Sequence, residues 1–189
     1  VPTALRNTAS VLITRGGEKL MFDCGEGTQR QMRCSVGLTP VDQIYLTHFH
    51  LDHCLGLPGL LKTYDLGDRT EPMRIFGPAG LEKLLSDWHP MIGRLGYHLE
   101  VEEGAAGDVI AHDGYEIEVF KAEHSSPNAV GYAMLEDDRP GRFDPEVARE
   151  LGVSEGPDFK LLQSGQTVTG SKGEVRPDQV MDEDRFGRA

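Results

Sequence analysis

Four side chains that commonly bind metal ions lie within six residues of one another. Residues 47–53 read THFHLDH and contribute His48, His50, Asp52 and His53. Imidazole and carboxylate groups are suitable ligands for zinc, which they bind at about 2.0–2.2 Å. On an extended or turning backbone, His48 and His50 can reach one ion from the same side, while Asp52 and His53 can face a second. Paired metal ions of this kind activate water in phosphoesterases, so the spacing predicts a hydrolytic metal centre.

His124 is a further candidate ligand. It follows an expected strand over residues 115–121, and the histidine cluster also follows a strand. If both strand ends line one edge of a sheet, His124 completes the first metal site with His48 and His50. From the residues alone, an ordinary position without a metal is the favoured interpretation of His124. The other three histidines are expected to be surface or core residues without a metal: His89, His98 and His112.

Short strands and helices alternate along the chain as far as residue 135. The pair Gly16-Gly17 predicts a hairpin turn. Strands are expected at residues 11–14, 19–23, 43–47, 73–76, 97–101, 109–112, 115–121 and 130–135, and helices at 26–36, 57–64 and 80–91. This mixture predicts a layered α/β or α+β fold.

The composition is that of a globular protein with a substantial core. The chain has 189 residues, of which 38% are hydrophobic and 26% charged. It contains no apolar run of about 18 residues, which a membrane span would need, and no secretory signal pattern. The three cysteines, Cys24, Cys34 and Cys54, form no CxxC pair. An odd number without such a pair favours a reducing cytoplasm over a disulfide framework.

The net charge is strongly negative. Asp and Glu number 31 against 19 Lys and Arg, a net charge of −12. Taken alone, this charge argues against a nucleic-acid partner, because phosphate contacts need basic side chains. The basic residues comprise 13 Arg and only 6 Lys, and an acidic, lysine-poor surface is also expected in a very salty cytoplasm, where ions screen the repulsion. Net charge alone therefore does not decide the partner.

The segment after residue 135 differs in character. Residues 136–158 are charged and rich in Gly and Pro, with one short helix expected at 145–151. Such a segment is expected to project from a domain, and an irregular hairpin is expected from Gly165 onward. By composition alone, its basic side chains are best explained as a solvated surface around the helix: Arg139, Arg142, Arg149 and Lys160.

Several motifs together resemble one family. Residues 22–29 read FDCGEGTQ, and the histidine cluster continues into GLPGLL at 56–61. Pro2-Thr3 with Arg6-Asn7 resembles the opening of the same family. The stretch from PGRF at 140–143 to Gly156-Pro157 resembles its flexible arm. On these motifs the chain resembles the ribonuclease Z family of the metallo-β-lactamase superfamily.

The resemblance implies an αββα sandwich formed by a single domain over residues 1–189, with residues 136–165 inserted as a tRNA-binding arm. It implies that His48, His50 and His124 bind one zinc ion and that Asp52 and His53 bind a second. Asp52 would also orient or deprotonate the attacking water, and Asp23 would support the ligands from behind. The implied substrate-binding residues of the arm are Arg139, Gly141, Arg142, Gly156 and Pro157.

The function implied by the resemblance is zinc-dependent removal of the 3′ trailer from precursor tRNA. It implies two zinc ions in each intact subunit and a homodimer. The cysteine usage and the lack of a long apolar run add the expectation of a cytoplasmic location and no membrane association. Two alternatives remain. One is another hydrolase of the same fold, acting on a different phosphodiester or, like an arylsulfatase, on another ester. The other is an inactive half-domain.

The chain also departs from the family pattern. Neither the GDT motif with its bridging aspartate, nor the histidine-glutamate motif, nor the C-terminal zinc-binding histidine is found in these 189 residues. The expectation is therefore an incomplete sandwich that supplies most of one zinc site and about half of the other.

Overall fold

The computed structural model describes residue 3 and residues 6–189. Pro2, which belongs to the segment compared with the family's opening, lies outside the described residues. The chain divides into two compact units. The first unit comprises Val1–Ile110 and Glu118–Ala133, and the second comprises Ala111–Ile117 and Met134–Ala189.

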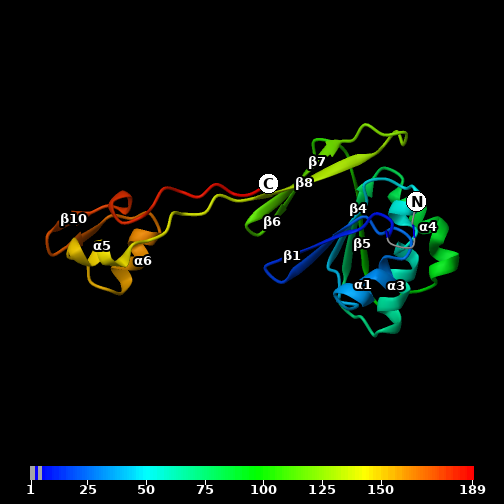
Figure 1. Ribbon diagram of the computed structural model, residues 1–189, viewed down its shortest axis with the longest axis horizontal. Helices are drawn as coiled ribbons and strands as arrows, with labels where there is room; N and C mark the ends of the chain where they lie inside the picture. The colour runs from blue at the N-terminus through cyan, green and yellow to red at the C-terminus, as the bar shows by residue number, and fades with distance from the viewer. Residues whose placement is uncertain (1–2, 4–5) are drawn as a thin grey trace. The chain divides into compact units, whose positions relative to one another are not determined.

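A five-stranded sheet forms the centre of the first unit, in the order β1-β2-β3-β4-β5 (Figure 1). β1 (Val11–Arg15) and β2 (Glu18–Phe22) form the expected antiparallel hairpin. β2, β3 (Gln43–Tyr45), β4 (Met73–Pro78) and β5 (Leu99–Gly104) run parallel to one another. The carboxyl ends of parallel strands lie at one edge of a sheet, so the residues that follow β2 and β3 lie side by side.

Three helices cover one face of this sheet, as Figure 1 shows: α1 (Thr28–Ser35), α3 (Leu57–Leu66) and α4 (Leu81–Ile92). Apolar side chains from these helices and from β2 to β4 form a continuous core. Its fully buried members include Met21, Ile44, Ile75, Leu57, Leu60, Leu61 and Leu81. Burying such side chains stabilises the layer by roughly 1.5–3 kcal/mol each.

Aromatic rings fill the opposite face of the sheet. Tyr132 lies 5.8, 5.4 and 6.1 Å from the rings of Phe22, Tyr45 and Phe76, measured between centroids. Tyr132 belongs to β8 (Val130–Glu136), a strand of a second sheet.

The second sheet has the order β6-β7-β8. Its other strands are β6 (Val109–His112) and β7 (Tyr115–Lys121). In β7 the buried residues Tyr115, Ile117 and Val119 alternate with the more exposed Glu116 and Glu118, as the sequence predicts. A helix layer, a sheet and a second sheet therefore follow one another in the order of an αββα sandwich, and the expected mixed α/β class is confirmed.

The second unit has a small core of its own. It contains α5 (Pro145–Glu150), α6 (Pro157–Gln163), the hairpin of β9 (Val168–Gly170) and β10 (Gly173–Val175), and the 3-10 turn η1 (Pro177–Gln179). Its buried side chains are Ala148, Val153, Leu162, Val168, Val175 and Val180. The segment is thus more ordered than the charged loop that composition suggests.

The helix α6 was not expected from the sequence. Its Gly156-Pro157 start is typical of loops, but proline is also favourable in the first turn of a helix because its missing N–H has no partner there. The helix forms because Leu162 is buried in the small core. Tertiary burial, rather than local propensity, therefore decides this element.

Within the second unit, the chain on either side of the small core runs as an antiparallel pair. Arg139 and Arg185 exchange two backbone hydrogen bonds of 2.9 and 2.8 Å, and Phe143 pairs with Met181. Among the described residues of both units, no helix is long and apolar enough to cross a membrane.

We expect Leu162→Ala to destabilise the second unit by about 2–5 kcal/mol, because it leaves a cavity in the small core. Leu162 is 0% exposed, whereas its neighbour Leu161 is 38% exposed, so Leu161→Ala is a matched control. Native-state hydrogen exchange of the amides in α6 and β9 measures the change. Equal protection in the two variants would show that this core does not hold the unit together.

Candidate metal centre

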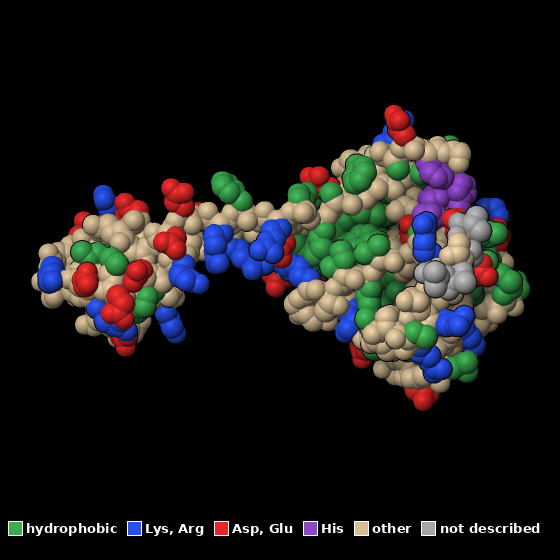
Figure 2. Space-filling model, in the orientation of Figure 1, with side chains coloured by type: hydrophobic (Ala, Val, Ile, Leu, Met, Phe, Trp, Pro, Cys, Tyr) green, Lys and Arg blue, Asp and Glu red, His purple; other side chains and the backbone are tan. Residues whose placement is uncertain are grey.

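Three histidines converge at the carboxyl edge of the five-stranded sheet. His48 follows β3, His50 directly precedes the short helix α2 (Leu51–Cys54), and His124 follows β7. Each offers a ring nitrogen, and these three nitrogens all lie within 4.8 Å of one another. Two ligands at about 2.1 Å from one zinc ion are at most about 4.2 Å apart, so small side-chain rotations close this group around an ion. Figure 2 shows the histidine side chains gathered in one place on the first unit.

His53 and Asp52 lie directly beside this group. The ring centroid of His53 is 4.1 Å from that of His48. Nε2 of His53 lies 4.0 Å from Oδ2 of Asp52, whose side chain is 47% exposed. Nδ1 of His53 lies 2.7 Å from Oδ2 of Asp23. With its Nδ1 proton donated to that carboxylate, His53 directs a free Nε2 toward the side where Asp52 lies.

The carboxylate of Asp23 is buried and accepts several hydrogen bonds. Besides His53, it binds the backbone N–H of Thr47 at 2.8 Å and the hydroxyl of Thr47 at 3.0 Å from each oxygen. The backbone N–H of Asp23 donates to the carbonyl of Tyr45 at 2.8 Å. Asp23 also has a φ of 59°. Such a conformation costs roughly 1–3 kcal/mol and persists where the surrounding structure enforces it.

His48 presents a nitrogen that fits a metal ion. It is only 4% exposed. Its Nδ1 lies 2.9 Å from the hydroxyl oxygen of Thr47, while its buried Nε2 has no hydrogen-bond partner among the described residues. Burial, and then the neighbouring rings of His53, His124 and His50, lower the pKa of His48 to about 4. A neutral imidazole with an unpartnered buried lone pair is the form that binds a metal, so the residues present fit such an ion.

The ring of His124 is held by a hydrogen bond to its Nδ1 atom. Its Nδ1 accepts the backbone N–H of Ser126 at 3.2 Å, within a loop closed by a 3.1 Å bond from the Ala122 N–H to the Ala129 carbonyl. Coordination by His124 therefore requires either a turn of this ring or the exchange of that hydrogen bond for a metal bond.

The FDCGEGTQ motif holds the backbone of α2 in place. The N–H of Cys24 donates to the carbonyl of His53 at 2.7 Å, and the N–H of Gly56 donates to the carbonyl of Cys24 at 2.9 Å. A side chain at Gly25 would overlap the carbonyl oxygen of Asp52. The glycine is thus required by the close approach of the two backbones, which places Asp52 and His53 beside Asp23.

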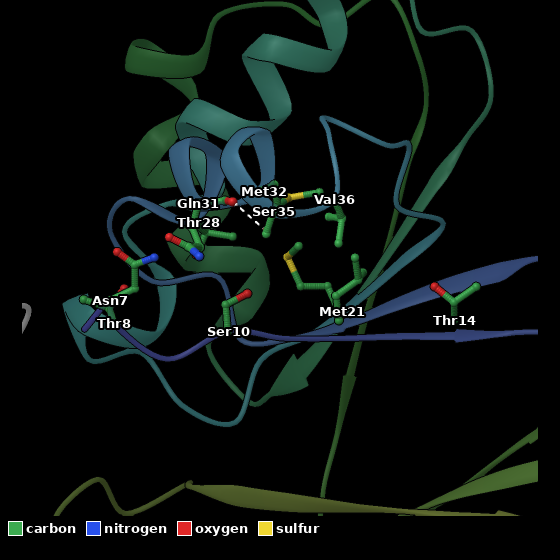
Figure 3. A pocket seen from close by; sticks show the side chains of 11 residues that line it. Asn7, Thr8, Ser10, Thr14, Met21, Thr28, Gln31, Met32, Ser35 and Val36 are labelled. Atoms are coloured by element: carbon green, nitrogen blue, oxygen red, sulfur yellow. Dashed lines mark hydrogen bonds between the residues drawn. The ribbon is translucent and has the colours of Figure 1, made fainter. Parts of the chain in front are cut away.

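A separate cavity of about 280 Å³ lies between β1, β2 and α1 (Figure 3). Apolar side chains such as Met21 and Met32 line it together with hydroxyl and amide groups, and its lining includes no imidazole, carboxylate or thiol. General acid, base and metal chemistry therefore belong to the histidine group rather than to this cavity.

The predicted metal ligands and Asp23 all lie together in the first unit, although their binding of metal stays a prediction. Sequence reasoning missed the part played by Thr47, whose only signal was its place between the strand and the first histidine. The remaining histidines belong to no group of three ligating side chains among the described residues. His89 and His98 are exposed, and His112 stacks on Tyr115 at 4.4 Å.

The predicted arm residues lie in the second unit. Arg139 is exposed and pairs with Glu136 at 3.1 Å, and Arg142 is also exposed. Gly141 is buried where a side chain would overlap the carbonyl of Asp182. Gly156 precedes α6 with a φ of 137°, and Pro157 is the first residue of that helix. In contrast, Arg149 is bound by both Glu146 and Glu155, as expected for a solvated surface side chain.

Comparison with known proteins identifies similar sequences along the whole chain. A sequence profile of the metallo-beta-lactamase superfamily matches residues 3–132. Ribonuclease Z of Methanosarcina acetivorans is 43% identical over 191 residues, which cover 100% of this chain and 62% of that protein. Ribonuclease Z of Haloferax volcanii is 46% identical over 195 residues, which cover 100% of this chain and 60% of that protein. The chain thus spans about 60% of the length of these curated relatives.

Solved structures show the same architecture. The short form of human tRNase Z matches with a TM-score of 0.62 and 27% identity, over 71% of this chain and 60% of that one. The metallo-beta-lactamase fold protein YhfI from Bacillus subtilis matches with a TM-score of 0.54 and 21% identity, over 71% of this chain and 52% of that one. The second likeness is one of fold alone.

We expect His48→Ala to weaken zinc binding by more than about 100-fold. This exceeds the 10–100-fold loss typical of residues that only support a ligand, because it removes the buried nitrogen at the centre of the group. Competition titration against a chromophoric chelator measures the affinity. His98→Ala, an exposed histidine outside the group, is the control. Zinc affinity that is the same in both variants would contradict the site.

Proposed function

The chain belongs to the metallo-beta-lactamase superfamily, and we propose that the protein is a zinc-dependent endoribonuclease that removes the 3′ trailer from precursor tRNA. The observation that carries this proposal is a converging histidine group in a chain that is 43–46% identical, along its whole length, to proteins named ribonuclease Z. The proposal includes a cytoplasmic protein that acts as a homodimer and holds two zinc ions in each intact subunit.

In this proposal the residues of the carboxyl edge hold the metal ions. His48, His50 and His124 take the first, and Asp52 and His53 contribute to the second. Bound zinc supplies a Lewis acid that makes water nucleophilic at neutral pH and offsets charge on the phosphate oxygens. The buried, neutral state of His48 keeps its nitrogen available for this role.

Asp52 is the proposed proton acceptor. Its side chain is 47% exposed and therefore reachable by water and substrate. The backbone of Asp52 is fixed, because its carbonyl accepts the N–H of Ala9 at 3.1 Å and lies against Gly25. A carboxylate held at this place can orient a water molecule and take its proton during attack on a phosphodiester.

Residues 136–165, which lie in the second unit, are the proposed tRNA-binding arm. Arg142 is exposed there, and the exposed Arg139 can exchange its surface ion pair with Glu136 for a phosphate group. Folded RNA is recognised largely by its shape and its backbone, so a few well-placed arginines are compatible with a net charge of −12. Under this proposal the negative charge reflects the salinity of the host cytoplasm rather than the absence of an RNA partner.

One observation favours a second candidate, hydrolysis of a small phosphodiester or another ester by the same centre. Residues 134–189 contain 13 Asp and Glu but only 8 Lys and Arg. With a net charge of −5, this part of the chain repels polyanions over distance, so RNA binding must depend on individual arginines. The two candidates differ in the effect of those arginines, which gives a direct test.

We expect the zinc-loaded protein to cleave the trailer from precursor tRNA. The double variant Arg139→Gln with Arg142→Gln should lose at least about tenfold in cleavage efficiency, because each charged hydrogen bond to phosphate contributes roughly 1.5–3 kcal/mol. Hydrolysis of bis(p-nitrophenyl) phosphate should be unchanged, since this small diester has no folded RNA for the arm to bind. Gel-based cleavage and colorimetric assays give the two rates.

The matched control is Arg149→Gln, which removes an arginine already bound by two glutamates. Equal losses in the control and the double variant would overturn the assignment of the arm. A zinc-loaded protein that hydrolyses the small diester but never cuts precursor tRNA would replace the first candidate by the second.

A further inference from the structure

Thr47 is held rigidly at the point where β3 gives way to the histidine cluster. Its carbonyl accepts the N–H of Val130 at 2.9 Å, and its own N–H donates to Asp23 at 2.8 Å. The preceding residue, Leu46, is fixed on both sides, by the Tyr132 hydroxyl at 2.7 Å and the Phe76 carbonyl at 2.8 Å. The direction of the Thr47 side chain is therefore set by two neighbouring strands.

The hydroxyl of Thr47 lies between a carboxylate and an imidazole. Its oxygen is 3.0 Å from both carboxylate oxygens of Asp23 and 2.9 Å from Nδ1 of His48. A hydroxyl has one proton to donate, and a carboxylate oxygen can only accept. The proton of Thr47 is thus directed to Asp23, and Thr47 must accept the hydrogen bond from His48. This arrangement requires the proton of His48 to be on Nδ1.

We propose that Thr47 is a positioning residue that selects Nε2 of His48 as the atom that binds metal. With the proton held on Nδ1, the lone pair is on Nε2, the buried atom that has no partner among the described residues. His48 belongs to the group of three histidines whose ligating nitrogens lie within 4.8 Å of one another. The inference rests on the proposed function in one respect: it takes a metal ion as the group that Nε2 of His48 binds.

The same carboxylate orients the histidines of both proposed metal positions. Asp23 reaches His53 directly, at 2.7 Å, but it reaches His48 only through the hydroxyl of Thr47. Hydrogen bonds that fix a ring's tautomer and orientation raise metal affinity, and their loss typically costs 10–100-fold. Thr47 thus links the first position to Asp23, whereas the second position does not depend on it.

The test compares Thr47→Val, which keeps the shape but removes the hydroxyl, with Thr47→Ser, which keeps the hydroxyl. Long-range ¹H–¹⁵N correlation spectra of the metal-free protein at neutral pH report the tautomer of His48. We expect the Nδ1–H form in the wild type and in Thr47→Ser, and loss of that fixed form in Thr47→Val. Zinc affinity at the position formed by His48, His50 and His124 should fall about 10–100-fold in Thr47→Val and recover in Thr47→Ser.

Thr14→Val makes the same atomic change on the edge strand β1 and serves as the control for the substitution itself. An Nε2–H tautomer of His48 in the wild type would overturn the inference, even if Thr47→Val failed to fold. Unchanged tautomer and zinc affinity in a folded Thr47→Val would overturn it as well. A wild-type protein that binds no zinc but shows the Nδ1–H form would reject the proposed function while upholding the positioning by Thr47.

Discussion

The hydrogen bonds of one buried carboxylate organise the candidate site. Asp23 accepts from the backbone and hydroxyl of Thr47 and from Nδ1 of His53, and its own N–H joins it to β3 through Tyr45. These bonds join the ends of β2 and β3 to α2, three segments that carry or support the ligands. A buried carboxylate is costly unless it is well hydrogen-bonded, so the arrangement is stable only when all of these segments are in place. The left-handed backbone at Asp23 is one cost of this geometry.

The fold explains why this carboxylate can reach so many partners. Parallel β2 and β3 bring their carboxyl ends to the same edge of the sheet, and the glycine at position 25 lets the following loop approach α2 closely. On the opposite face of the sheet, Tyr132 packs against Tyr45 and its hydroxyl donates to the carbonyl of Leu46. These contacts hold the residues that join β3 to the histidine cluster. The predicted metal ligands are therefore positioned by the sheet and its packing.

Much of the fold and of the candidate site could be predicted from the sequence. The spacing of apolar residues indicates which positions are buried, and clustered histidines indicate metal binding. Apart from the short helix α2, the strands and helices of the first unit are expected from the sequence to within a few residues. The six residues predicted for the site lie close together, and their roles stay predictions. The expected strand over 43–47 instead ends at Tyr45, since the N–H of Thr47 binds a side chain rather than a neighbouring strand. The helix α6 and the role of Thr47 could not be predicted, because both depend on contacts between residues distant in sequence.

The central claim is that Asp23 supports both proposed metal positions at once. The most direct measurement is isothermal titration of zinc into Asp23→Asn, an isosteric change in which an amide NH₂ replaces one acceptor oxygen. Zinc that binds the folded variant about 10–100-fold more weakly at each position that the wild type fills would support the account. Unchanged zinc affinity at every filled position, with circular dichroism showing an intact fold, would contradict it.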